Sequence, residues 1–423
     1  MEYFINEILD LYNKSFPLLI DKRKKTCNPW TNYKIQKLVA RKRFLLRRNR
    51  IRNKTCYSDQ LKLANKNIKK AVLKAKKLYY SKLFSNRNSK RKWAEINKFI
   101  NKKKEKNVES HINHNELKNY FASIFTEKSN NNNVETTIAI TKTAFLKPTN
   151  RREILECFGT FKNKKTHQEN DIPMFLWKII SCKILEPTTF LVNQMFELAK
   201  FPIIFKNADI TPIFKKGDIY KASNYRPIAT LHNLSKVFER VILNRVKQFC
   251  DNNNIIPTHQ YGFREEHSTT DAVLSLHLEI EKNKLANYHT CAIFLDLSKA
   301  FDLVNHNSLL QILQSFGFRG HFNSLLSSYL SNRLFRIKWQ SSFSSYTSIT
   351  RGVPQGGILS PILYSLYVAD FGSVYPKVIQ YADDSTILIG YKDIGELNHI
   401  VTEVGRKIEV YREKKSLIIN TAK

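Results

Sequence analysis

Residues 379–389, with the sequence IQYADDSTILI, place two adjacent aspartates, Asp383 and Asp384, inside a run rich in apolar and β-branched residues. β-Branched residues favour strands, whereas adjacent acids are poor residues for the interior of a strand. We therefore expect a hairpin, with residues 378–382 in one strand, residues 385–390 in the next, and the two aspartates at the tight turn between them.

A third acid, Asp296, directly follows another apolar run, residues 291–295. Carboxylates at the rim of buried strands lose hydration and repel one another, and a bound divalent cation compensates for both costs. Nucleotide transfer needs charge neutralised on the attacking and leaving oxygens, and two cations held by three carboxylates can do this. The alternative is structural: Asp296 would cap a helix over residues 298–304, and the adjacent pair would form an ordinary turn.

Short motifs recur in a recognisable order along the second half of the chain. Residues 296–302 (DLSKAFD), 352–357 (GVPQGG) and 381–384 (YADD) have the order and rough spacing of the A, B and C motifs of reverse transcriptases, so the chain from about residue 200 resembles that family. Residues 224–228 (NYRPI) and 260–264 (QYGFR) resemble the fingers motifs of polymerases of non-LTR retrotransposons, of the jockey type and related LINE-like groups.

The resemblance implies an α+β fold, namely a right-hand polymerase whose palm carries an antiparallel sheet. It places the fingers at about residues 201–290 and 307–350, and the palm at residues 291–306 and 351–423. In this family the chain continues into a helical thumb, and an endonuclease precedes the polymerase. We therefore expect a chain that is truncated at both ends and in which the thumb is absent.

The resemblance also assigns roles in the reaction. Asp296, Asp383 and Asp384 would be the catalytic carboxylates and the metal ligands, holding two Mg²⁺ ions, with Mn²⁺ as an alternative. Phe301 falls where the family places an aromatic ring under the sugar, and the ring would exclude a 2′-hydroxyl. As an alternative, Phe301 would simply be a core residue.

Gln355 and Gly356 belong to the second motif. By resemblance Gln355 would contact the incoming base and the template, and Gly356 would allow close approach of the backbone. The alternative is a plain turn before a helix. Arg264 would either contact the template or form a structural ion pair. Lys423 resembles the lysine of the family's D motif, which is proposed to protonate pyrophosphate.

Two cationic residues point to binding of the triphosphate. Arg226 and Lys215 lie on the runs 210–216 and 225–230, which we expect to pair as a hairpin. The resemblance makes Arg226 a clamp on the triphosphate, and arginine suits two-pronged contact with phosphate. Lys215 is an additional candidate, although charged residues at the tip of a hairpin are commonly just solvated.

The charge of the chain is concentrated near its beginning. Its net charge is +34, and residues 21–107 hold 31 of the 70 Lys and Arg but only 4 of the 36 Asp and Glu. Apolar residues recur every three or four positions over residues 61–78, which predicts an amphipathic helix. Residues 29–39 and 91–100 are similar, so we expect two or three basic helices that bind nucleic acid. The alternative is a solvated charged coil.

These patterns define the expected organisation of the chain. They predict a basic helical region at 1–127, a linker at 128–150 around an asparagine run, a helical extension at 151–200, and the polymerase at 201–423. The six cysteines show no Cys-x-x-Cys pair, which argues against a zinc knuckle or a disulfide framework.

An anionic membrane surface is the competing partner for a basic region. However, the sequence contains no run of about 18 apolar residues and begins with acids rather than with the basic head of a signal peptide. We therefore expect no membrane association and an intracellular protein. The family resemblance and the clusters of Lys and Arg favour the nucleus.

The leading hypothesis is an RNA-directed DNA polymerase whose partners are a template RNA, a DNA primer end and deoxynucleoside triphosphates. A second hypothesis is a catalytically inactive, RNA-binding remnant of such an element. A third is a maturase of the group II intron type, which would normally carry a maturase domain. The sequence determines neither the template nor the oligomeric state.

Overall fold

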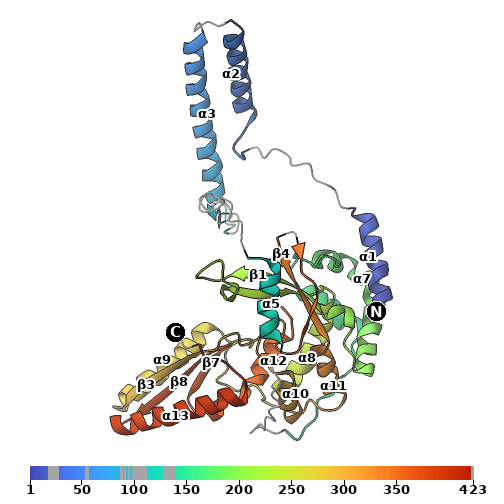
Figure 1. The fold of residues 1–423 in the computed structure, drawn as a ribbon, viewed down its shortest axis with the longest axis vertical. Helices are drawn as coiled ribbons and strands as arrows, with labels where there is room; N and C mark the ends of the chain where they lie inside the picture. The colour runs from blue at the N-terminus through green and yellow to red at the C-terminus, as the bar shows by residue number, and fades with distance from the viewer. Residues whose placement is uncertain are drawn as a thin grey trace. The chain divides into compact units, whose positions relative to one another are not determined.

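The computed structural model describes residues 1–17, 28–52, 57–85, 112–126, 140–340 and 342–420, together with a few single positions between residues 89 and 97. This part of the chain forms two compact units, which are described separately. The larger unit comprises Met1–Phe16 and Ser110–Lys423, and the smaller one comprises Pro17–Glu109. Figure 1 shows the elements coloured along the chain.

The smaller unit contains two packed helices, α2 (Tyr33–Arg52) and α3 (Ser58–Ser85). The ring of Trp30, just before α2, lies 6.3 Å from the ring of Tyr79 on α3, which ties the start of one helix to the end of the other. Both helices were expected from the spacing of their apolar residues. The third expected helix, at 91–100, lies largely outside the described residues.

The first sheet of the larger unit has the strand order β2-β1-β4-β5, and β6 also pairs with β4. β1 and β2 are antiparallel, with Ile213 opposite Arg226, which confirms the hairpin expected from the sequence. β1 also pairs in parallel with β4 and is therefore an interior strand. The strands are β1 (Asn207–Phe214), β2 (Tyr225–Thr230), β4 (Arg333–Trp339), β5 (Ser342–Phe343) and β6 (Thr347–Ile349).

Helix α5 (His114–Phe125) packs on this sheet although it lies far ahead of it in the chain. Its residues Leu117 and Phe121 are fully buried in a cluster with Phe335 of β4. The sequence placed residues 1–127 in a single basic region. The structure instead joins α5 and the first helix of the chain to the larger unit, because their apolar faces are buried there.

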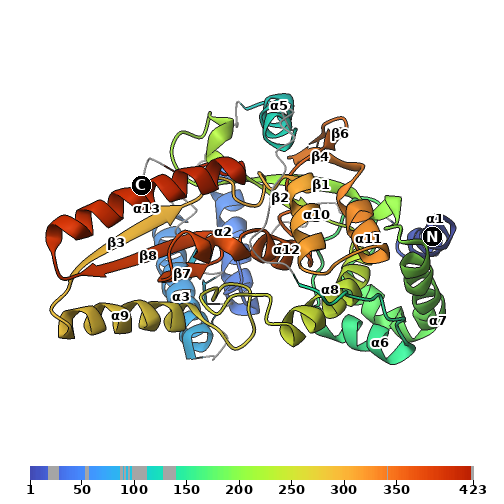
Figure 2. The ribbon, with the colours of Figure 1, turned by 90° about the horizontal axis from the view of Figure 1, so that it is seen from below.

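The second sheet has the order β3-β8-β7, and both pairs are antiparallel, as expected. Its strands are β3 (His289–Asp296), β7 (Val378–Tyr381) and β8 (Asp384–Tyr391). Figure 2 shows the sheet between α13 (Ile394–Lys414) and α9 (Thr269–Leu285). The sequence grouped α9 with the segments of the first sheet, but α9 contacts all three strands of the second one.

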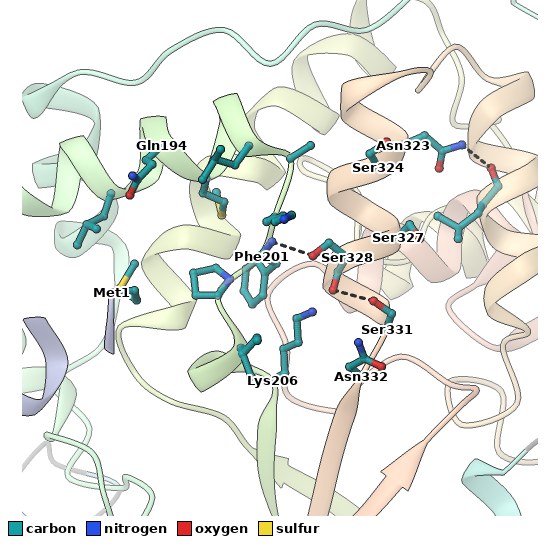
Figure 3. Close-up of a pocket in the computed structure, with 18 of the residues that line it drawn as sticks. Met1, Gln194, Phe201, Lys206, Asn323, Ser324, Ser327, Ser328, Ser331 and Asn332 are labelled. Atoms are coloured by element: carbon teal, nitrogen blue, oxygen red, sulfur yellow. Dashed lines mark hydrogen bonds between the residues drawn. The ribbon is translucent and has the colours of Figure 1, made fainter. Parts of the chain in front are cut away.

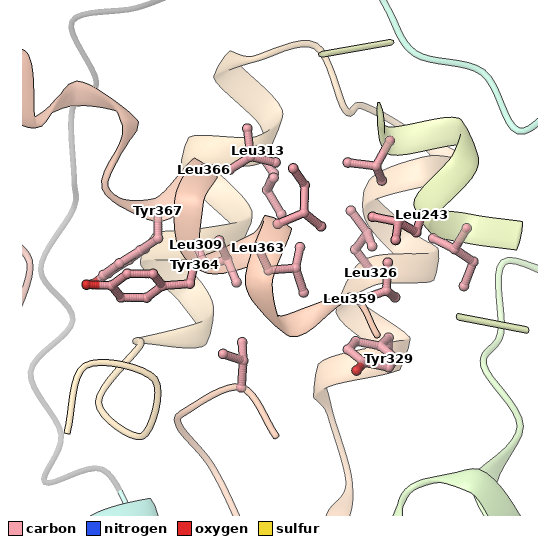
Figure 4. Close-up of a cluster of buried hydrophobic side chains, with 14 of the residues drawn as sticks. Leu243, Leu309, Leu313, Leu326, Tyr329, Leu359, Leu363, Tyr364, Leu366 and Tyr367 are labelled. Carbon is pink, nitrogen blue, oxygen red and sulfur yellow. The ribbon is translucent and has the colours of Figure 1, made fainter. Parts of the chain in front are cut away.

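The remaining helices of the larger unit pack in a hydrophobic core that also includes buried residues of β7 and β8, and Figure 4 shows part of it. Leucines and tyrosines from several helices interdigitate there, including the fully buried Leu309, Leu363 and Tyr364. Within the described ranges, no helix combines the length and the apolar character needed to cross a membrane. The helices are α1 (Glu2–Ser15), α6 (Arg151–Thr160), α7 (Met174–Leu198), α8 (Ser235–Asn252), α10 (His306–Ser315), α11 (His321–Leu330) and α12 (Ser360–Tyr367), with short 3₁₀ turns at Ile203–Phe205, Ala222–Asn224 and Ala369–Ser373.

Candidate active site

Three aspartates meet at one end of the three-stranded sheet. Asp296 is the last residue of β3, Asp384 is the first residue of β8, and the two are direct partners in the antiparallel register. Directly opposed residues in an antiparallel pair lie on the same face of the sheet. The two carboxylates therefore emerge side by side although they come from distant parts of the chain. Asp383 lies in the turn just before β8.

The turn that carries Asp383 lies one residue earlier than the sequence suggested. β7 ends at Tyr381 and β8 begins at Asp384, so only Ala382 and Asp383 remain between the strands. Ala382 has a φ of 58°, in the left-handed region that two-residue hairpin turns use. Asp384 is thus a strand residue rather than a turn residue, and its strand pairing fixes where its side chain begins.

Asp384 and Asp296 are close enough to Asp383 to influence its ionisation. The pKa of Asp383 is raised chiefly by burial, and the negative charges of Asp384 and Asp296 raise it further. A hydrogen bond to the backbone at Asp383 and the positive charge of Arg226 act in the opposite direction. This arrangement of like charges favours a positively charged ligand, because such a ligand relieves the repulsion.

The acids open onto a cavity of about 720 Å³. Its walls come from the loop after β3, from β2, from the loop before α12 and from the β7–β8 turn. All eight residues that the sequence assigned to metal binding or nucleotide binding line this cavity. These residues are Asp296, Asp383, Asp384, Arg226, Lys215, Phe301, Gln355 and Gly356.

The cationic residues line the cavity as exposed side chains. Arg226 on β2 and Lys215 just after β1 form no ion pair with any residue that the structure describes. Arg264 donates a hydrogen bond to the carbonyl oxygen of Pro257 at 3.1 Å, so a backbone acceptor rather than an acid holds its guanidinium. Lys423 lies outside the described residues.

Phe301 both packs against the core and lines the cavity. Its ring stacks on the ring of Tyr364 on α12, with centroids 4.7 Å apart and planes inclined by 21°. Phe263 meets it edge-on at 5.9 Å. The ring of Phe301 is therefore held in one place by two aromatic neighbours, and the sequence-based alternatives of core residue and sugar contact are compatible with each other.

The loop that carries Gln355 and Gly356 docks against the end of β2. Ala229 donates its backbone N–H to the carbonyl oxygen of Gln355 at 3.0 Å. Gly356 has a φ of 137°, and a Cβ atom there would lie 2.4 Å from the carbonyl oxygen of Ala229, so only glycine fits. The side chain of Gln355 donates a 2.7 Å hydrogen bond from Nε2 to Oδ1 of Asp302.

Two polar residues, Asn420 and Asp302, hold other residues of the site, and the sequence did not predict these roles. Asn420 donates from Nδ2 to Oδ2 of Asp296 at 2.6 Å, and from its backbone N–H to the carbonyl oxygen of Asp296 at 2.8 Å. Its position three residues before Lys423, in the D motif, was the only available signal. Asp302 is 3% exposed, and burial raises its pKa to about 7 against the opposing effects of Gln355 and Lys299.

Helix α5 also contributes to the cavity, which nothing in the sequence indicated. Phe121 and Ile124 line it. The ammonium group of Lys299, in the loop after β3, lies 4.7 Å from the ring centroid of Tyr120, a favourable cation–π distance. The loop that follows Asp296 is therefore in contact with a helix from the first third of the chain.

The chemistry of the acids fits a magnesium ion. Mg²⁺ prefers carboxylate oxygens and normally completes its coordination shell with water and substrate phosphates. Among the residues that the structure describes, no group of three or more His, Cys, Asp or Glu side chains is arranged so that it could hold a metal ion. A bound cation would therefore need ligands beyond the three aspartates, such as water and the phosphates of the nucleotide.

Comparisons with known proteins agree with this geometry. Residues 213–423 match the model of the family described as reverse transcriptase (RNA-dependent DNA polymerase). Similar proteins from Drosophila melanogaster include the probable RNA-directed DNA polymerase from transposon BS, which is 31% identical over 58% of this chain and 27% of that protein. The probable RNA-directed DNA polymerase from transposon X-element is 33% identical, over 55% of this chain and 26% of that protein.

The RNA-directed DNA polymerase from mobile element jockey, also from Drosophila melanogaster, is 29% identical over 64% of this chain and 31% of that protein. The matched part of this chain therefore spans only about a quarter to a third of the length of these three relatives. The similarity concerns the polymerase portion of longer proteins.

Proposed function

Because residues 213–423 belong to the reverse transcriptase family, we propose that this chain is the polymerase portion of a non-LTR retrotransposon protein and copies RNA into DNA. One observation carries the proposal: Asp296 and Asp384 are paired across two strands, with Asp383 beside them at the cavity. An acid in a cleft whose pKa is raised by burial and by neighbouring acids, as that of Asp383 is, is typical of catalytic sites.

The reaction is a nucleotidyl transfer in which the three aspartates hold divalent cations, Mg²⁺ or Mn²⁺. When bound, such cations neutralise the charge on the attacking and leaving oxygens. Arg226 binds the triphosphate, since a planar guanidinium makes two parallel hydrogen bonds to phosphate oxygens, and Lys215 adds a mobile positive charge. Support for these roles comes from the place of both cations on the wall of the cavity that contains the acids.

Two further residues select the nucleotide. Phe301, held between Tyr364 and Phe263, forms the surface beneath the sugar and leaves no room for a 2′-hydroxyl. Gln355, held by Asp302, lies beside the incoming base and the template. A fixed side chain discriminates better than a mobile one, because it does not move away from the wrong substrate.

We assign the five-stranded sheet with α5 to the fingers and the three-stranded sheet to the palm. Primer and template would lie along the palm face that carries the acids, and this proposal is supported by the exposed Phe294, which shares that face with Asp296. The basic helices α2 and α3 add a positive surface for the template RNA. We further propose that the protein works in the nucleus, because its primer would be the end of a chromosomal DNA strand.

Primer extension tests the proposal. The full chain would be given a poly(A) template, an oligo(dT) primer, deoxynucleoside triphosphates and Mg²⁺ or Mn²⁺, beside a variant that combines Asp383→Asn and Asp384→Asn. We expect extension by the wild-type chain, none by the variant, and equal RNA binding by both. RNA binding without extension by the wild-type chain would instead support the inactive remnant.

A further inference from the structure

A second cavity lies outside the candidate active site and shares none of its lining residues. Its volume is about 1000 Å³, and it lies between the end of α7, the segment 199–206 and one side of α11. Figure 3 shows this arrangement. Lys200 and Lys206 are among its lining residues, but no Asp or Glu is, so within the described residues its walls carry only positive charge.

Lys206 is the unusual member of this cavity. It is only 4% exposed, and no carboxylate among the residues described by the structure lies within ion-pair distance of its ammonium group. Figure 3 shows its side chain extending towards Ser328 and Ser331. Burial of an ammonium group without a counter-charge is costly, and burial together with the positive charge of Arg333 lowers the pKa of Lys206. An anionic ligand would offset this cost.

A second buried cation increases the excess of positive charge. Arg333, at the start of β4, is 1% exposed and close enough to Lys206 that the two positive charges repel. One nitrogen of its guanidinium donates to the carbonyl oxygen of Tyr329, but Nε and Nη2 have no hydrogen-bond partner among the residues that the structure describes. Its charge interacts with that of Glu239, which already accepts the backbone N–H of Ile358.

One wall of the cavity is a row of hydroxyl groups. Ser324, Ser327, Ser328 and Ser331 recur at spacings of three and four along α11 and its C-cap, so they share one side of the helix. The hydroxyl of Ser328 accepts the backbone N–H of Phe201. At about 1.5 Å per residue the row is roughly 10 Å long.

The opposite wall is apolar. Leu198, at the end of α7, and Ile203, in the following 3₁₀ turn, are 58% and 69% exposed. Hydroxyl groups on one side, exposed aliphatic groups on the other and a buried ammonium group between them suit a ligand that is both anionic and partly apolar. A nucleotide has this character, because its phosphate is charged and its base has apolar faces.

We propose that this cavity binds the phosphate backbone of a single-stranded nucleic acid, with one phosphate held by Lys206 and its neighbour by the serine hydroxyls of α11. Contacts of Lys, Ser, Asn and Gln side chains to phosphate oxygens are the common means of positioning a strand without reading its sequence. The choice of nucleic acid over other anions rests on the proposed polymerase function. The cavity then marks a second contact with template or product, outside the active site.

A pair of variants that differ only in charge tests the proposal. Ser331 is exposed at the cavity, so both Ser331→Glu and Ser331→Gln should fold normally. The probe is a fluorescent 12-nucleotide single-stranded RNA, titrated into the full chain at several salt concentrations. We expect Ser331→Glu to bind several-fold more weakly than Ser331→Gln, because both variants lose the same hydroxyl group and differ only in charge. Equal affinities of the two variants would overturn the proposal.

Lys206→Met provides a second test, because methionine keeps the length of the side chain but removes its charge. We expect the slope of log Kd against log salt to decrease by about one, as for the loss of one phosphate contact. RNA carrying 4-thiouridine should also cross-link to peptides that contain residues 198–206 or 321–332. Cross-links confined to other parts of the chain would contradict the proposal.

Further measurements distinguish RNA from other anions as the ligand, and distinguish this site from the proposed polymerase function. If a glutamate-rich peptide or inorganic phosphate bound with the same dependence on Ser331→Glu while RNA did not, the assignment to nucleic acid would be wrong. Failure of primer extension alone, with binding still sensitive to the charge at Ser331, would overturn the proposed function and leave this site in place. Normal primer extension, with RNA binding that does not depend on the charge at Ser331, would overturn this site and leave the proposed function in place.

Discussion

The amide group of Gln355 donates a 2.7 Å hydrogen bond to the buried carboxyl group of Asp302, which joins the loop before α12 to the loop after β3. Gln355 and Asp302 both line the candidate active-site cavity. This bond uses one of the two N–H groups of Nε2, so the other N–H and the carbonyl oxygen of Gln355 remain available to a nucleotide. The buried acid thus helps to fix the orientation of the glutamine amide.

Asp302 should make stability depend on pH. Burial raises its pKa to about 7, above its ordinary value of 3.8. A carboxyl group with a raised pKa binds its proton more tightly in the folded state, so its contribution is complete below about pH 4 and is lost as the pH rises through 7. We expect this group to lower the free energy of unfolding by up to about 1.4 kcal/mol per pH unit over that range.

Chemical denaturation of the wild type and of Asp302→Asn at a series of pH values measures this effect. The difference between the two profiles isolates Asp302 from other titrating groups. We expect the wild type to lose more stability than the variant between about pH 4 and 7. Parallel profiles would show that the carboxyl group is not buried as described.

Replacing Phe301 by alanine should weaken discrimination against ribonucleotides. The ring is held by Tyr364 and Phe263, and its loss opens space beneath the sugar. We expect the ratio of kcat/KM for deoxynucleotides to that for ribonucleotides to fall about tenfold to a hundredfold. Phe301→Tyr keeps the ring and is the control. Unchanged selectivity in the alanine variant would remove the role in sugar selection and leave Phe301 as a core residue.

Asn420→Ala should impair the acid that it holds. Its side chain donates a 2.6 Å hydrogen bond to Asp296, and hydrogen bonds to charged groups contribute about 1.5–3 kcal/mol. We expect a higher Mg²⁺ concentration for half-maximal primer extension and a lower kcat. Asn253→Ala, which removes an amide that donates to the carbonyl oxygen of Phe249 outside the cavity, is the control. An unchanged Mg²⁺ requirement in the Asn420 variant would contradict this role.

Gly262→Ala should disturb the turn that carries Asp383. A Cβ atom at this position would lie 2.2 Å from the backbone nitrogen of Ala382, so the turn or the loop must move. We expect a cost of about 1–3 kcal/mol and a lower Tm. Gly405→Ala on α13 is the matched control, because its Cβ would meet no atom within 4 Å, and alanine favours the helix. If Gly262→Ala melted at the same temperature as the wild type, Gly262 would not be in close contact with the turn at Ala382.

The sequence predicted the hairpin of the acids because its information is local. Alternation of apolar residues, an adjacent pair of acids and a short turn are all present within residues 379–389. The exact turn was not predictable at that level. Whether Asp384 ends the turn or begins the strand depends on its pairing with Asp296, which is a contact between distant segments.

The features that the sequence analysis missed arise from long-range packing. α5 covers a sheet whose strands follow it by about a hundred residues or more, and its apolar spacing does not specify which surface it covers. The contact of Asn420 with Asp296 spans a similar distance. Only the fold shows that α9 packs on β3, β7 and β8. Short motifs therefore predicted residues that the structure brings to one cavity, and tertiary contacts show what holds them.

The most direct test of the account is the binding of Mn²⁺ in the presence of primer, template and nucleotide, measured by electron paramagnetic resonance. The central claim is that Asp296 and the Asp383–Asp384 pair, from two distant segments, hold the same cations. We predict that Asp296→Asn and Asp384→Asn, each alone, reduce Mn²⁺ binding and remove extension while RNA binding persists. Unchanged Mn²⁺ binding in either single variant would contradict the claim.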